Sequence, residues 1–281
     1  MALNPKNSAY NLDNALACAK ASLLAYDAAI TSAKVANAFG LRVTDLAPFD
    51  GAGTDAKGFL AQLDGAIAIV FRGTDSLANW IDDAEILPLP FRNKGSVHSG
   101  FLHSLDSVWP TISGTLERWK GGGRTLWITG HSLGGALAML AAAMLRFPAD
   151  ASVPAAVAGV YTFGQPRVGT RDFAQSCDAD FGNFYFRFVN NADIVPRIPP
   201  RVLGYWHAGK LEFIDADGSI HDDISWWHEM LDSVEVGLDG LRNLQAQKPE
   251  LAAIQDHAMN LYLAAIQAAW SAAHPGGPPG A

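Results

Sequence analysis

Apolar positions recur along the chain with the spacing of helices in some segments and of strands in others. Residues 12–26 carry an apolar side chain every three or four positions, which predicts a helix capped by Asn11 or Asp13. The dipeptide Asp64-Gly65 separates two apolar runs and is typical of a β-hairpin turn. Strands are predicted at 58–63, 66–71, 125–128, 157–163, 184–189 and 210–214. Further helices are predicted at 101–119, 136–145, 172–181 and over most of 223–269.

From residue 125 onward the predicted strands alternate with predicted helices. This order is typical of a mainly parallel sheet with helices on both faces, so the predicted fold class is α/β. A chain of 281 residues is within the size range of one such unit, and we expect a single domain over 1–272. Residues 273–281 are rich in Pro and Gly, which predicts a flexible tail.

Composition and charge exclude several classes of protein. Hydrophobic residues make up 49% of the chain and charged residues 17%, which indicates a globular protein rather than a disordered one. The net charge of −8 and the lack of any dense Lys/Arg run argue against nucleic acid or an anionic membrane as a partner. No run reaches the roughly 18 apolar residues of a transmembrane segment. Nothing in the sequence indicates an oligomeric state.

The N-terminus and the two cysteines bear on the compartment. The first residues lack the basic start and apolar core of a signal peptide, so the sequence as given predicts a soluble, cytoplasmic protein. A secreted protein from which a leader was trimmed is the alternative. Cys18 and Cys177 fit either two buried thiols or one long-range disulfide, and buried thiols are the favoured interpretation. Two cysteines this far apart do not form a metal knuckle.

The strongest chemical motif is Gly130-His131-Ser132-Leu133-Gly134-Gly135, which lies between a predicted strand and a predicted helix. A nucleophile elbow requires this context. Side chains two residues before and after the serine would collide in so tight a turn, which explains the glycines at 130 and 134. The turn lifts the Ser132 hydroxyl above the sheet edge and directs the Leu133 N–H toward the place of an oxyanion. The alternative, a phosphate-binding loop, lacks its lysine.

With this motif in place, the chain resembles the fungal-type, or class 3, triacylglycerol lipase family of the α/β-hydrolase superfamily. Further segments agree with the family in the same order along the chain, over roughly Ala15 to Leu263. They are Val70-Phe71-Arg72-Gly73-Thr74, Val97-His98-Ser99-Gly100-Phe101, Tyr161-Thr162-Phe163-Gly164-Gln165-Pro166-Arg167-Val168-Gly169 and Asn191-Ala192-Asp193-Ile194-Val195-Pro196. The resemblance implies the α/β-hydrolase fold and an esterolytic serine.

The resemblance also implies an oxyanion hole. In the family the residue after the strand end Phe-Arg-Gly completes the hole, a position that Thr74 occupies here. Thr74 can offer both a backbone N–H and a hydroxyl beside the Leu133 N–H. The alternative is a strand-end threonine that caps the next turn. Asn79-Trp80-Ile81 followed by Asp83 resembles the lid helix of the family, which implies that Asp83 braces Thr74.

The segment 76–84 has two interpretations. Leu77, Trp80 and Ile81 fall on one helical face, so the segment fits an amphipathic lid that opens at an oil–water interface. An ordinary surface helix that docks its apolar face on the core is the alternative. The neighbouring residues 85–91 add apolar surface and favour acyl chains as the substrate.

Asp193 and His257 complete the chain order serine, acid, histidine that α/β-hydrolases share. Asp193 follows a predicted strand, at the carboxyl end where such sheets build their sites, although it could instead cap a turn. His257 resembles the late histidine of the family. His207, His221 and His228 are the rivals for the base, and each fits a solvated or core histidine. The chain between acid and base is longer than the family pattern, which indicates an insertion within 220–250.

These residues predict a serine hydrolase that cleaves carboxylic esters of lipids through an acyl-enzyme on Ser132, with no metal or organic cofactor. The expected partner is a lipid or small ester substrate. A short-chain or feruloyl-type esterase with the same triad is the main alternative, because fold and triad leave the substrate open. A non-catalytic binding protein of the same fold is the second alternative, but such proteins usually lack a triad member.

Overall fold

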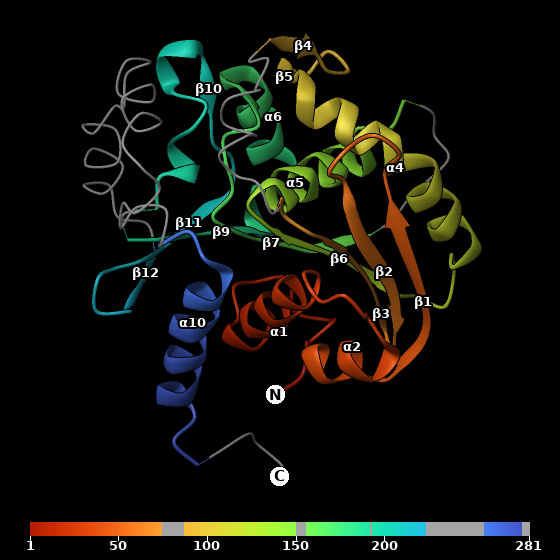
Figure 1. Ribbon diagram of the computed structural model, residues 1–281, viewed down its shortest axis with the longest axis vertical. Coiled ribbons are helices and arrows are strands. Elements are labelled where there is room, and N and C mark those ends of the chain that lie inside the picture. Colours follow the sequence, from red (N-terminus) through yellow and green to blue (C-terminus); the bar gives the residue numbers. More distant parts are fainter. Residues whose placement is uncertain (75–86, 150–155, 192, 223–255, 277–281) are drawn as a thin grey trace.

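The computed structural model describes residues 1–74, 87–149, 156–191, 193–222 and 256–276, and a central sheet organises them. Its eight strands lie in the order β1-β2-β3-β6-β7-β9-β11-β12 (Figure 1). They are β1 (Val43–Asp50), β2 (Lys57–Leu63), β3 (Ala66–Phe71), β6 (Thr125–His131), β7 (Val157–Phe163), β9 (Tyr185–Asn190), β11 (Lys210–Ile214) and β12 (Ile220–Asp222). The run from β3 to β11 is parallel, whereas β1, β2 and β12 pair antiparallel at the two edges. The expected mainly parallel sheet is therefore present.

Helices cover both faces of the sheet, which gives a three-layer α/β/α arrangement (Figure 1). Helices α4 (Ser99–Arg118), α5 (Leu133–Arg146) and α6 (Arg171–Phe181) pack on one face. Helices α1 (Leu12–Leu24), α2 (Ser32–Phe39) and α10 (Met259–Ala273) pack on the other. Strand β3 shows how the sheet serves two cores, because Ile67 and Ile69 join the first and Ala68 and Val70 join the second.

Several predicted elements are confirmed with small shifts at their ends. The Asp64-Gly65 hairpin joins β2 and β3, and Asn11 caps α1 by accepting from the backbone of Asp13 and Asn14. Strand β6 runs on to His131, and α5 begins at Leu133, three residues earlier than expected. Helix α10 continues to Ala273, the first residue assigned to the tail. Most of the predicted helix over 223–269 lies outside the described residues.

The sequence patterns missed several elements of the fold, among them β1, β12 and α2. Strand β1 has polar residues at 44, 45 and 50 and buries only Phe49, so it lacks the alternation of a half-buried strand. Helix α2 has only eight residues. A second, four-stranded antiparallel sheet in the order β10-β8-β5-β4 was also missed. Its strands are two or three residues long, too short for a periodic signal: β4 (Pro88–Pro90), β5 (Ser96–His98), β8 (Gly169–Thr170) and β10 (Tyr205–Trp206). Short 3-10 turns follow β9, namely η2 (Val195–Arg197) and η3 (Arg201–Leu203), and η1 (Gly182–Phe184) precedes it.

The first and last described helices lie side by side. Helix α1 packs along α10, and the Trp270 indole N–H donates to the Asp13 carboxylate at 2.7 Å (Figure 1). The thiols of Cys18 and Cys177 are both free and buried, as the favoured interpretation predicted. Over the described ranges, no helix combines the length and apolarity that crossing a bilayer requires.

Candidate active site

Ser132 occupies the sharp turn between β6 and α5. Its backbone has φ 58° and ψ −128°, a strained conformation for a residue with a side chain. The flanking glycines are needed for the reason predicted: a Cβ on Gly130 would lie 2.3 Å from the Gly134 carbonyl oxygen, and one on Gly134 would lie 2.5 Å from the Phe71 carbonyl oxygen. The predicted elbow geometry is therefore present around Ser132.

The turn is fixed by the sheet below it and by the helix that follows. The Ser132 N–H donates to the Phe163 carbonyl at 2.9 Å, which ties the serine to the end of the neighbouring strand β7. The Ser132 carbonyl accepts from Gly135 and Ala136, so α5 starts at Leu133. The Leu133 N–H thus belongs to the first turn of a helix, where the backbone carries partial positive charge.

Asp193 and His257 form a buried hydrogen-bonded pair. The His257 Nδ1 and the Asp193 Oδ2 are 2.8 Å apart, and the two residues are 6% and 0% exposed. Because a carboxylate accepts, Nδ1 carries the proton and a neutral imidazole keeps its lone pair on Nε2. This nitrogen is buried and has no hydrogen-bond partner among the described residues, the Ser132 hydroxyl included. In ligand-free enzymes the bond from base to nucleophile is often long and shortens in the complex.

Gly164 shows how close this pair lies to the elbow. It follows Phe163, whose carbonyl binds the Ser132 N–H, and it has φ +57°. A Cβ on Gly164 would lie 2.9 Å from both the Asp193 Oδ2 and the His257 Nδ1. Two neighbouring residues therefore contact the two parts of the site: Phe163 binds the serine backbone, and Gly164 packs against Asp193 and His257. The carboxyl ends of β6, β7 and β9 bring all three predicted triad residues to one edge of the sheet.

A chain of hydrogen bonds holds the segment that carries His257. The His131 Nε2 lies 2.7 Å from the His257 carbonyl and must donate to it, so the His131 Nδ1 accepts from the Tyr26 hydroxyl at 2.7 Å. Burial, followed by the proximity of His257, holds the pKa of His131 well below its usual value. The His131 ring is therefore neutral and links Tyr26, in the turn after α1, to the segment that carries the predicted base. Asn190 adds a second tie by donating to the Asp256 carbonyl at 2.8 Å.

Tyr262, on α10, braces the predicted acid. Its hydroxyl donates to the Asp193 Oδ2 at 2.5 Å and accepts from the Asn190 N–H at 3.0 Å. Burial and the nearby Asp193 charge raise the pKa of Tyr262 well above its usual value, so the hydroxyl keeps its proton. The other carboxylate oxygen accepts from the Val195 N–H at 2.9 Å. The buried carboxylate therefore has donors on both oxygens, as a buried charge requires.

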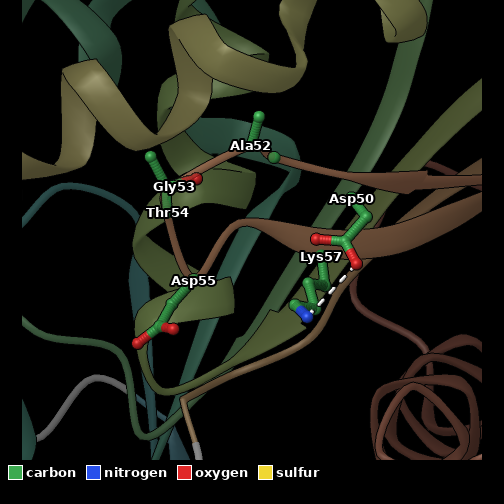
Figure 2. Close-up of a pocket in the computed structure, with 7 residues that line it drawn as sticks. Asp50, Ala52, Gly53, Thr54, Asp55 and Lys57 are labelled. Atoms are coloured by element: carbon green, nitrogen blue, oxygen red, sulfur yellow. Dashed lines mark ion pairs between the residues drawn. The ribbon is translucent and has the colours of Figure 1, made fainter.

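Thr74 lies beside the elbow, as the resemblance implied. A Cβ on the preceding Gly73 would lie 3.1 Å from the Ser132 Cβ. The Thr74 hydroxyl donates to the Asp55 Oδ2 at 2.9 Å, so in this structure it points to a carboxylate. Figure 2 shows Asp55 on the loop between β1 and β2, near the Lys57–Asp50 ion pair of 3.2 Å. Asp55 thus contacts the residue that Asp83 was predicted to brace, and Asp83 itself lies outside the described residues.

The rival histidines lie elsewhere. The His207 Nε2 donates to the Pro196 carbonyl at 2.7 Å, and the His221 Nε2 lies 2.7 Å from the Asp215 carboxylate in the β11–β12 hairpin. His228 and the lid candidates Leu77, Trp80 and Ile81 lie outside the described residues.

Sequence reasoning missed three supporting side chains, Tyr26, Tyr262 and Asp55. Tyr262 comes five residues after His257, more than one helical turn away, and that spacing alone assigns it no role. Tyr26 and Asp55 lie far from the triad in sequence, and only the tertiary fold brings them to it.

Comparisons with known proteins identify the chains to which this one is similar. The class 3 lipase family matches residues 68–203. A lipase of Rhizomucor miehei is 38% identical over 162 residues, which is 56% of this chain and 44% of that protein, so the chain spans less than half the length of this relative. A solved structure of the Rhizomucor miehei triacylglyceride lipase has a TM-score of 0.57 with 32% identity, covering 70% of this chain and 79% of that one. A triacylglycerol lipase whose catalytic centre is a serine protease triad gives a TM-score of 0.64 with 25% identity, covering 87% and 90%.

Proposed function

The chain belongs to the class 3 lipase family, and from this premise we propose that it hydrolyses carboxylic esters of lipids through an acyl-enzyme on Ser132. The observation that carries the proposal is the buried Asp193–His257 pair beside a strained serine elbow. A protein that only binds lipid does not need a buried carboxylate that orients an imidazole.

The reaction follows from the positions of the proton and the lone pairs. The Ser132 Oγ attacks the ester carbonyl carbon while His257 Nε2 takes the hydroxyl proton. Asp193 keeps the proton of the other ring nitrogen in place and stabilises the imidazolium that forms. The C–O bond of the ester then breaks, and the imidazolium returns the proton to the departing alcohol. Water attacks the acyl-serine in the same way and releases the carboxylic acid.

Two backbone donors serve the developing oxyanion in this proposal. The Leu133 N–H belongs to the first residue of α5, and the Thr74 N–H comes directly after Gly73, which lies close to Ser132. The loss of one such donor costs about 3 to 4 kcal/mol in other enzymes. The Asp55 carboxylate, by accepting from the Thr74 hydroxyl, fixes the residue that provides the second donor.

Lipids are the proposed substrate class because of the family and the low exposure of the site. Ser132 is only 2% exposed and His257 6%, so an ester reaches them after part of the chain moves. A substrate with an apolar acyl chain can bind to apolar side chains as it reaches such a buried site, which favours lipids. A short-chain or feruloyl-type esterase would use the same triad and remains the competing proposal for substrate choice.

Covalent labelling tests the chemistry, and ester length tests the substrate. A fluorophosphonate is expected to modify the wild-type chain at Ser132 and to leave Ser132→Ala unlabelled, while the exposed Ser271→Ala labels normally. Rates on p-nitrophenyl esters are expected to rise from two-carbon to eight-carbon acyl groups and again above the solubility limit. Labelling of Ser132→Ala would show that Ser132 is not the nucleophile. A constant preference for the shortest ester would contradict lipids as the substrate class.

A further inference from the structure

A cavity of about 260 Å³ lies over strands β9 and β11. Four of its lining residues are arginines, namely Arg167, Arg187, Arg197 and Arg201, and among the described residues Asp178 is the one carboxylate that lines it. We refer to this cavity as the arginine pocket. The chain as a whole has a net charge of −8, so this local excess of positive charge runs against the overall balance.

Arg187 is the most informative residue of the arginine pocket. It projects from β9, is only 4% exposed, and its Nε donates to the Ala208 carbonyl at 2.9 Å. Within the described ranges its other guanidinium N–H groups make no hydrogen bond and no ion pair. Burial lowers the pKa of Arg187, which shows that its charge is poorly solvated there. Buried charges in proteins are normally paired, whereas Arg187 feels the charge of Asp178 without a direct ion pair among the described residues. The guanidinium group is therefore suited to a further counter-charge.

The other arginines are held in place. Arg167, which is 6% exposed, donates from Nη1 to the carbonyls of Arg197 and of Pro199, the latter at 3.0 Å. Arg201 stacks on the Trp206 ring with its guanidinium carbon 4.2 Å from the ring centre. Because backbone and aromatic contacts fix these groups, little side-chain entropy is lost when they bind a ligand.

The neighbouring polar groups leave Arg187 without an ion pair among the described residues. The Asp178 Oδ1 accepts from the Gly209 N–H at 2.7 Å instead. His207 is neutral, since burial and the nearby Arg187 and Arg167 hold its pKa well below the usual value. Its Nδ1 is buried, and the part of the chain that the structure describes gives it no hydrogen-bond partner.

We propose that the arginine pocket binds a phosphate-type oxyanion, either the free ion or the phosphate of a lipid headgroup. Guanidinium forks match the oxygen pairs of a tetrahedral oxyanion, and a dianion would supply the charge that Arg187 lacks. The volume of about 260 Å³ admits a phosphate with a short substituent and excludes the acyl chains of a lipid. The pocket therefore takes the polar end of a ligand only.

The arginine pocket is connected to the triad through one short turn. Arg197 ends η2, which begins two residues after Asp193, and the first N–H of η2, that of Val195, donates to the Asp193 carboxylate. An anion that binds Arg197 would hold this turn in place. Anion binding is therefore expected to raise thermal stability without any contact with the ester site.

Titration of the full chain with inorganic phosphate tests the proposal. Ionic strength is held constant with sodium chloride, and binding is followed by calorimetry and by the unfolding midpoint. We expect saturable binding of about one phosphate per chain and a rise in Tm of roughly 3 °C or more. Arg197→Gln, at a half-buried position, is expected to weaken binding at least tenfold, and Arg187→Met to abolish it.

Arg171→Gln is the matched control. Arg171 stacks on the same Trp206 ring at 4.9 Å but does not line the pocket, so this variant is expected to bind phosphate like the wild type. If Arg187→Met does not fold, Arg197→Gln alone decides. An equal response of Arg197→Gln, Arg171→Gln and wild type, or no effect beyond that of chloride, would overturn the proposal.

Lipid vesicles identify the source of the phosphate. Binding to vesicles of phosphatidylcholine with phosphatidic acid is compared with binding to phosphatidylcholine alone, for wild type and Arg197→Gln. If phosphatidic acid increases vesicle binding of the wild type but not of Arg197→Gln, the ligand of the arginine pocket is a lipid headgroup. If inorganic phosphate binds but phosphatidic acid does not increase vesicle binding, the ligand is the free ion. If neither binds, the pocket has no such ligand.

Discussion

The proposed nucleophile and the proposed base are held in position in two different ways. Ser132 is fixed by the backbone, through a strained turn that only glycine neighbours permit and a bond to the next strand. His257 is fixed by side chains, through Asp193, Tyr262 and the His131 ring that reaches its carbonyl. The elbow is thus a local structure, whereas the base depends on contacts between segments that are far apart in sequence.

This difference predicts which substitutions leave the rest of the site intact. A change at the base should remove chemistry but leave the elbow folded, because the elbow needs nothing from His257. A change in the packing between the elbow and the segment of His257 should disturb the position of the imidazole first.

The largest effect is expected from His257→Ala. Without the imidazole nothing takes the Ser132 proton, so kcat/KM should fall by roughly 10⁴ while the unfolding midpoint changes little. His221→Ala is the control, since His221 contacts Asp215 in a hairpin away from the site, and its activity should stay within about twofold of wild type. Ester hydrolysis rates for both variants check this. An equal loss in His221→Ala would mean that the base is misassigned.

The second effect concerns Gly164, which lies between elbow and base. Gly164→Ala would place a methyl group 2.9 Å from the Asp193 Oδ2 and the His257 Nδ1, and we expect activity to fall by roughly 100-fold as the pair shifts. Gly53→Ala tests backbone strain alone, because Gly53 has φ +73° but open space around it. Both variants should lose about 1 kcal/mol of stability through the positive φ, and Gly164→Ala should lose more through the collision, but only Gly164→Ala should lose activity. Equal activity loss would assign the effect to strain instead of collision.

A smaller effect is expected from Tyr262→Phe, which removes one donor from the Asp193 carboxylate. The acid should then orient the imidazole less well, so we expect kcat to fall roughly tenfold with KM unchanged. Tyr10→Phe is the control for the loss of a tyrosine hydroxyl, since the Tyr10 ring meets the Phe186 ring edge to face, with the ring centroids 5.4 Å apart. A rise in KM with constant kcat would show that Tyr262 acts on substrate access and not on the acid.

The smallest effect is a pH dependence of stability through His131. Burial holds its pKa below that of the unfolded chain, about 6.5, so below that pH the unfolded state takes up a proton that the folded state refuses. Stability should therefore fall with decreasing pH, by up to about 1.4 kcal/mol per pH unit for this group. His131→Gln should reduce the slope of the unfolding free energy between pH 6.5 and 5.5, whereas the exposed His103→Gln should leave it unchanged. An unchanged slope in His131→Gln would show that other groups dominate.

The same contrast explains how much could be predicted from the sequence. Short sequence patterns predict three features: the glycine spacing predicts the elbow, the turn residues predict the β2–β3 hairpin, and the apolar periodicity predicts the order of strands and helices. Asp193 and His257 could be proposed from chain order and from a family resemblance. Their support by Tyr262, Tyr26 and His131 could not, because no local pattern says which side chains from β6, α10 and the turn after α1 will meet. The Thr74–Asp55 contact, from two separate loops, was missed for the same reason.

The contact between α1 and α10 makes the proposed base sensitive to events far away in the sequence. Helix α10 begins two residues after His257 and packs along α1. A local loosening of this helix pair would therefore shift the imidazole, while the elbow between β6 and α5 keeps its shape. Proton transfer would then stop at temperatures at which most of the protein is still folded.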